Sequence, residues 1–164
     1  MKLLAVVLIL PLVMFSGSAN ADCIDPAAAG VNWRRCFQDG RDLENAALAG
    51  AQLREATFTR ADLDGADLSG ADAYRAKFIS ASMVDINLTD ARLTGADLTR
   101  ADLTGAVLAG TDLRMAKLVG ALLRGADLTG ARLARADLSH ADLSGATWVD
   151  GERLCADGSI GECH

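Results

Sequence analysis

Apolar residues recur along this chain with a period of five. Steps of five from Leu43 to Trp148 meet 22 positions, and every one of them is apolar. A second series lies two residues before the first, and it is alanine at every step from Ala46 to Ala146 with two exceptions. Glycine or a polar residue usually closes each unit. Residues 41–150 therefore form a tandem array of five-residue units.

A period of five fits neither a helix nor a flat strand. On an α-helix each step of five advances about 140° beyond a full turn, which would spread the leucines around the axis. In a flat strand an odd step alternates faces, so half of the leucines would point to water. Both apolar series stay inside only if the chain turns a corner once per unit. Successive coils then stack at the ordinary inter-strand spacing of ~4.8 Å and bury a shared core.

The charged residues indicate how many units make one coil. Two sets alternate in sign at steps of twenty, namely Asp72, Arg92, Asp112, Arg132 and Lys77, Asp97, Lys117, Asp137. Coils of four units stack each set into a ladder of opposite charges, whereas coils of three units would place Lys77 beside Arg92 and stack acids on acids. Phe58 and Phe78 are also twenty residues apart. The pattern predicts an all-β, four-sided β-helix with four units per coil and about five and a half coils, roughly 26 Å tall.

The N-terminal segment, residues 1–21, is typical of a secretory signal. A positive charge precedes an apolar run over residues 3–15, and a small-x-small cleavage pattern occupies residues 19–21. The run is shorter than the ~18–20 residues of a membrane span, although a retained N-terminal anchor is the alternative. A lipoprotein signal does not fit, because Asp22 precedes Cys23. We expect an exported chain, periplasmic or secreted, that begins at Asp22 and has no membrane span after cleavage.

Four cysteines lie in two clusters near the ends of the chain, namely Cys23, Cys36, Cys155 and Cys163. An even number of cysteines in an exported chain indicates disulfides, with three pairings to choose from, and free or metal-bound thiols are the alternative. The two ends of the stack should lie ~25 Å apart, beyond the ~7 Å Cα limit of a bridge. We therefore expect Cys23–Cys36 in an N-terminal cap over residues 22–40, and Cys155–Cys163 in a C-terminal cap over residues 151–164.

Units such as Ala61-Asp62-Leu63-Asp64-Gly65 closely resemble the pentapeptide-repeat family, whose consensus is A-(D/N)-L-x-x. The resemblance covers residues 41–150 and implies a right-handed quadrilateral β-helix. It also implies that the many aspartates are a structural choice. Some members of the family resemble duplex DNA and protect DNA gyrase, so a DNA-mimicking modulator of gyrase or topoisomerase is the alternative function. The export signal and the absence of a loop inserted in the repeat argue against it.

Acidic and basic side chains occupy opposite halves of the predicted prism. The faces of Leu43 and Leu48 are mainly acidic, and the faces of Leu53 and Phe58 are mainly basic. The candidate interaction face comprises Asp62, Asp64, Asp67, Asp102, Asp127 and Asp142. On the basic half, charge ladders should leave Arg54, Arg75, Arg114 and Arg135 less paired. Drift among solvated surface positions is the alternative explanation.

No residue pattern of the chain indicates catalysis. The chain has no nucleophile with a base, no phosphate-binding loop and no metal-ligand spacing, and its two histidines are isolated. We therefore expect no enzyme, no cofactor and no metal. The net charge of −6 disfavours direct binding to nucleic acid. The sequence predicts a structural or protein-interaction module whose partner is another protein. We expect the module itself to be a monomer or an end-to-end dimer.

Overall fold

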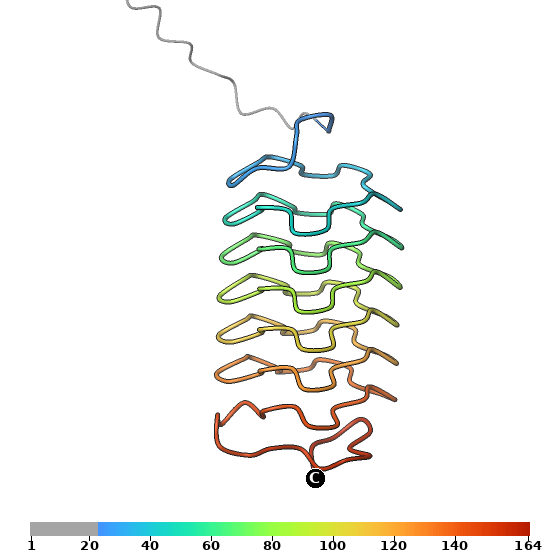
Figure 1. The fold of residues 1–164 in the computed structure, drawn as a ribbon, viewed down its shortest axis with the longest axis vertical. Coiled ribbons are helices and arrows are strands. Elements are labelled where there is room, and N and C mark those ends of the chain that lie inside the picture. The colour runs from blue at the N-terminus through green and yellow to red at the C-terminus, as the bar shows by residue number, and fades with distance from the viewer. Residues whose placement is uncertain (1–22) are drawn as a thin grey trace, which may run out of the picture.

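The computed structural model describes residues 23–164, and over that range the chain is a stack of coils (Figure 1). It contains no helix and no strand longer than one bridge in the described part. Instead, one residue of each unit pairs in parallel with the residue twenty positions later, from Asn32 with Gln52 to Asp127 with Thr147. The predicted signal segment, residues 1–21, lies outside the described residues.

Backbone hydrogen bonds repeat with the same period of twenty. The Leu63 N–H donates to the Ser82 carbonyl at 2.8 Å, and the Ser82 N–H donates back to the Ala61 carbonyl at 3.0 Å. Between successive units, a bond over only three residues closes the corner, as from the Ala66 N–H to the Leu63 carbonyl at 3.0 Å. A partner twenty residues away means that four units complete one coil, as the charge ladders predict.

The core is built from the two apolar series. The central leucines from Leu48 to Leu128 are fully buried, and the alanines two residues earlier fit beside them at the corners. Phe58 and Phe78 stack in successive coils with ring centroids 5.1 Å apart and planes 6° from parallel. Thr111 replaces an alanine, and its hydroxyl donates to the Leu88 carbonyl at 2.7 Å, which satisfies a buried polar group.

Each unit before the last ends in a residue with a left-handed backbone conformation. Every closing residue from Arg35 to Gly145 has a positive φ, for example 64° at Gly65 and 54° at Asp85. Glycine adopts this conformation without the steric cost that a Cβ brings. Within residues 23–164, twelve residues other than glycine nevertheless have a positive φ, and five of them are arginines, which places long side chains at corners of the prism.

The regular coils start ten residues earlier than the sequence predicts. Parallel bridges begin at Asn32, so the units run over residues 31–150 and form six coils. The expected cap over residues 22–40 and the expected five and a half coils are therefore wrong at this boundary. The start of the coils is hard to recognise in the sequence, because Gln38 places a polar side chain at a central core position. It is 1% exposed, and its amide donates to the Cys23 carbonyl and accepts from Arg41.

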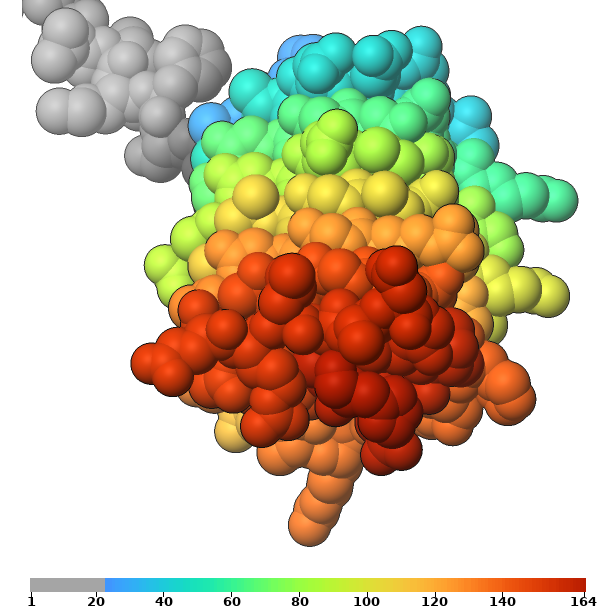
Figure 2. Space-filling view, turned by 60° about the horizontal axis from the view of Figure 1, so that its bottom comes forward, coloured from blue at the N-terminus to red at the C-terminus, as the bar shows by residue number. Residues whose placement is uncertain are grey.

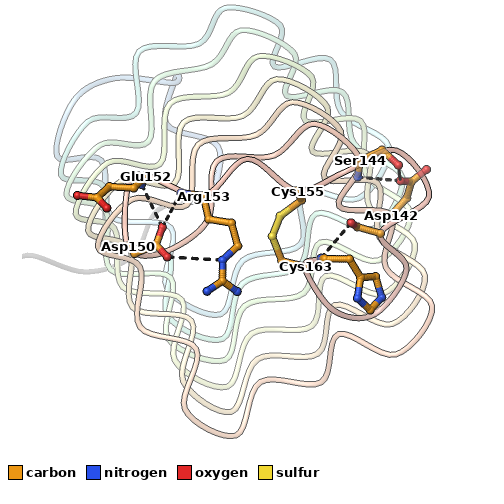
Figure 3. Close-up of a disulfide and its surroundings, with 9 residues drawn as sticks. Asp142, Ser144, Asp150, Glu152, Arg153, Cys155 and Cys163 are labelled. Atoms are coloured by element: carbon orange, nitrogen blue, oxygen red, sulfur yellow. Dashed lines mark hydrogen bonds and ion pairs between the residues drawn. A yellow bond between two sulfur atoms is a disulfide. The ribbon is translucent and has the colours of Figure 1, made fainter.

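Both ends carry a disulfide. Cys23 pairs with Cys36 and Cys155 with Cys163, with Cα atoms 5.3 Å and 4.9 Å apart. These are the pairs that the coil geometry predicts. Figure 3 shows the second bridge over the end of the prism. The space-filling view shows the last residues spread over that end (Figure 2).

The C-terminal segment covers only half of the last coil. It pairs antiparallel with the coil through Asp142 with Ile160 and Thr147 with Leu154. The other half, residues 131–140, has no such cover. The N–H groups of Leu133, Arg135, Leu138 and His140 have no hydrogen-bond partner among the described residues. This half of the end is an open β-edge above half-buried leucines.

Within residues 23–164, no helix is long and apolar enough to cross a membrane.

Candidate interaction surface

The four sides of the prism differ in charge, and each is defined by its central residues. Face 1 contains the units centred on Trp33 and on every twentieth residue after it. Faces 2, 3 and 4 follow in the same way from Gln38, Leu43 and Leu48. Because the chain visits the faces in this order, face 1 lies opposite face 3.

The structure places the predicted acidic residues on two adjacent faces. Asp62, Asp102 and Asp142 lie in one column of face 3, separated by Ser82 and Leu122 through the bridges between coils. Asp64 lies at the turn beside this column, and its carboxylate accepts from the Ser82 hydroxyl and the Val84 N–H. Asp67 and Asp127 lie in one column of face 4, with Asn87 and Val107 between them.

Most of these aspartates also hold the turn that follows them. One carboxylate oxygen of Asp102 accepts from the Thr104 N–H at 3.0 Å, and Asp127 accepts from Thr129 in the same way at 2.9 Å. Hydrogen bonds from the Ser69 N–H and hydroxyl lower the pKa of Asp67. Asn87 makes the same bond to Thr89 at 3.1 Å, so the turn needs the oxygen and not the charge. The second oxygen is left for other partners.

Asp142 differs from the other five candidate acids. It is 8% exposed and forms an ion pair with Arg124, which reaches it from the preceding coil. Hydrogen bonds from Ser144, together with Arg124, lower its pKa to about 2. Its charge is therefore neutralised within the protein, and it contributes little to an exposed acidic surface.

Face 1 carries the largest concentration of positive charge. Because the coils start at residue 31, this face gains Arg34 and Arg35 beyond the six arginines that the sequence pattern assigns to it. Its eight arginines are Arg34, Arg35, Arg54, Arg75, Arg92, Arg114, Arg132 and Arg135. Against them stand three acids, Glu55, Asp72 and Asp112. Face 1 thus has an excess of five positive charges.

Three acids hold five of these arginines in ion pairs. Glu55 lies 3.0 Å from Arg35. Asp72 lies 3.5 Å from Arg54 and 3.6 Å from Arg92. Asp112 is similarly shared, at 2.8 Å from Arg114 and 3.3 Å from Arg132. The hydrogen bond from Arg114 holds the pKa of Asp112 far below its usual range.

These pairs correct part of the sequence prediction. Arg75 and Arg135 have no carboxylate within ion-pair distance among the described residues, as expected. Arg54 and Arg114 form ion pairs, whereas the sequence predicts them to be among the less paired arginines. The third arginine of face 1 without a carboxylate partner among the described residues is Arg34, which lies before the expected start of the repeat.

Tyr74 is a feature of face 1 that the sequence pattern does not reveal. The guanidinium groups of Arg54, Arg75 and Arg92 lie 4.9 to 5.1 Å from the centroid of its ring. Such cation–π contacts hold the guanidinium groups in place. The available signal is the twenty-residue spacing of Arg54 and Tyr74, which places them in successive coils.

Two open hollows lie on the same face. One, of about 410 Å³, is lined by Arg34, Arg35, Arg54 and Glu55. The other, of about 390 Å³, is lined by Thr94, Arg114, Met115, Ala134 and Arg135. Neither contains a nucleophile paired with a base. Within residues 23–164, no three metal-ligating side chains are grouped to hold an ion.

Several proteins of known structure are similar to this chain. A comparison with curated protein sequences found no match. Among solved structures, HetL of Nostoc sp. strain PCC 7120, a protein involved in heterocyst differentiation regulation, is 31% identical; the alignment covers 76% of this chain and 68% of HetL, with a TM-score of 0.38. QnrB1, a plasmid-mediated fluoroquinolone resistance protein, is 25% identical over 72% of this chain and 63% of its own, with a TM-score of 0.45. Rfr23 of Cyanothece 51142 is 25% identical; the alignment covers 71% of this chain and 90% of Rfr23, with a TM-score of 0.42.

The family model for pentapeptide repeats matches residues 42–72, 86–125 and 116–147, with eight copies of the repeat. These segments make up more than half of the chain, and they coincide with coils whose inward leucines and alanines the structure buries. The chain belongs to the pentapeptide repeat family.

Proposed function

We propose that this protein is an exported, non-catalytic module that binds a partner protein through the acidic surface of faces 3 and 4. The observation that carries the proposal is the distribution of charge on these faces. Asp62, Asp67, Asp102 and Asp127 lie on two adjacent flat sides, and none of them has a basic partner within ion-pair distance in the described chain. A cationic partner protein is the complement of such a surface.

The two disulfides support the exported location. They close both ends of the coil stack, and no cysteine of the described chain is left free. Disulfides persist in oxidising compartments and are rare in the cytosol. Cleavage after Ala21 would start the chain at Asp22. An intact-mass spectrum of the exported protein tests this, and a mass that includes residues 1–21 would contradict it.

The acidic surface is tested by substitutions that remove charge and keep the turns. Asn87 shows that asparagine supports the same turn, so Asp62→Asn, Asp67→Asn, Asp102→Asn and Asp127→Asn together should leave the fold intact. We expect an envelope protein captured by the wild type to be lost with this variant, and its capture to weaken as salt rises.

A control variant neutralises charge on another face. Arg60→Gln, Lys77→Gln and Arg100→Gln change basic residues on face 2 that have no ion-pair partner among residues 23–164. This variant should capture the same protein as the wild type. If the asparagine variant also captured it unchanged, the acidic surface would have no role in binding. Inhibition of gyrase supercoiling by the purified protein would instead favour the alternative of DNA mimicry.

A further inference from the structure

Opposite sides of the prism carry equal and opposite charge. Face 1 has an excess of five positive charges, as described above. Face 3 carries seven acids, Asp42, Glu44, Asp62, Asp64, Asp85, Asp102 and Asp142. It carries only Arg41 and Arg124 as bases, which leaves an excess of five negative charges. The molecule therefore has a strong charge asymmetry perpendicular to its long axis.

The positive side is ordered before any partner arrives. The ring of Tyr74 and the carboxylate of Asp72 together hold Arg54 and Arg92 from two sides. Arg34, Arg75 and Arg135 are left without a carboxylate. Ordered guanidinium groups lose less conformational entropy when they bind carboxylates. Face 1 is thus prepared to bind a flat surface of acidic side chains.

The complementary surface with the same spacing is face 3 of another copy of this chain. Both faces belong to the same six coils, so their side chains repeat with the same spacing along the axis. A copy displaced sideways without rotation sets face 3 against face 1, coil by coil. Arg34 then lies level with Asp42, and Arg92 lies level with Asp102. No inserted loop interrupts either face between residues 31 and 150.

We infer that face 1 of one molecule binds face 3 of a second copy. Because the two contact surfaces differ, each bound molecule leaves one of each kind exposed, and side-by-side association is open-ended. Six coils of five-residue sides give a face of at most about 29 by 17 Å, or about 500 Å². Stable interfaces bury about 800 Å² on each partner, so each contact is weak and depends on ionic strength. The inference rests on the proposed function in one respect, namely that face 3 is a contact surface.

Two neutralised variants test the contact. The first carries Arg34→Gln, Arg75→Gln and Arg135→Gln and keeps face 3. The second carries Asp42→Asn, Asp62→Asn and Asp102→Asn and keeps face 1. Sedimentation velocity of the wild type at about 10 mM ionic strength, where the screening length is about 30 Å, should show species that grow with protein concentration. At about 1 M, where that length is about 3 Å, the wild type should be monomeric.

Each variant alone should stay monomeric at low ionic strength, because each lacks one of the two surfaces. An equimolar mixture should form a one-to-one complex and nothing larger, since each variant supplies the surface that the other lacks. The face 2 variant Arg60→Gln, Lys77→Gln, Arg100→Gln has the same net charge as the arginine variant, and it should associate like the wild type. Unchanged thermal unfolding of all variants would show that they are folded.

The outcomes separate this inference from the proposed function. A wild type that stays monomeric at low ionic strength, or variants that associate alone, would overturn the inference. The arginine variant keeps the acidic surface, so its continued capture of an envelope protein would leave the proposed function standing. Association of the wild type in sedimentation velocity, combined with a failure to capture any envelope protein, would support the inference and contradict the proposed function. If face 1 instead bound only another anionic molecule, such as lipid vesicles with acidic headgroups, the second copy would be the wrong occupant.

Discussion

Two adjacent leucines offer a sharp test of the inward and outward assignment. Leu123 occupies a central position and is fully buried, whereas Leu122 lies on the outer surface of face 3 and is half-buried. The two side chains are identical, and they differ only in their position within the five-residue unit. Leu123→Ala and Leu122→Ala therefore remove the same atoms from opposite sides of one stretch of backbone.

The expected cost of Leu123→Ala follows from its surroundings. Removing three carbon groups from the core costs about 2.4 kcal/mol in transfer free energy, at about 0.8 kcal/mol for each. Collapse of the cavity is limited, because the Leu123 N–H bonds to the Asp142 carbonyl at 2.7 Å and holds the coils at a fixed distance. A cavity contribution therefore adds to the transfer cost, for a total of about 3–5 kcal/mol. Leu122→Ala opens no cavity, and its cost should stay below about 1 kcal/mol.

Chemical denaturation followed by far-ultraviolet circular dichroism measures both free energies of unfolding. At about 2–4 °C for each kcal/mol, Leu123→Ala should also lower the Tm by roughly 10 °C. The wild type and both variants should unfold with the same dependence on denaturant. Equal losses for the two variants, or a larger loss for Leu122→Ala, would refute the assignment of side chains to the core.

Three further predictions concern acid stability, the disulfide and the open edge. The pKa of Asp142 is lowered to about 2 in the folded state, so its contribution is present above its unfolded pKa of about 3.9 and is lost as pH falls toward 2. The stability difference between wild type and Asp142→Asn should therefore shrink over that window, and a constant difference would contradict the ion pair. Replacing both Cys155 and Cys163 by serine should lower the free energy of unfolding by about 2–3 kcal/mol, which denaturation measures; an unchanged value would mean that the bridge does not constrain the end. The Leu133 amide should exchange with solvent far faster than that of Leu113, which donates to the Arg132 carbonyl, and equal protection by hydrogen-exchange NMR would show that the edge is covered.

The interior of this fold is predictable from sequence because two periods constrain it independently. The period of five assigns Leu123 to the core, and the period of twenty in the charges sets the number of units per coil. The start of the coils is harder to predict, because Gln38 interrupts the apolar series. Its burial depends on bonds to Cys23 and Arg41, which no local pattern reveals. The right-handed sense of the coil is an expectation from the family.

The sequence predicts where the charged side chains lie on the surface, but it does not predict which of them form ion pairs. Sequence arithmetic places Asp62 and Asp142 in one column, which the bridges between coils reproduce. It does not reveal that Arg124 reaches Asp142, because that ion pair depends on the direction of a long side chain at a corner. Arg54 is mispredicted for the same reason. It leans toward Asp72 and Tyr74 in the next coil.

The two periods have different consequences when the length of the chain changes. Loss or gain of five residues keeps every leucine in the core, so the solenoid still folds. It also turns everything downstream by a quarter of a revolution, which moves arginines of face 1 onto a neighbouring side and mixes the columns of charge. Only a change of twenty residues preserves both the interior and the pattern on the outside. Duplication or deletion of a whole coil is therefore the route by which such a protein can change its length and keep the pattern of charge on its sides.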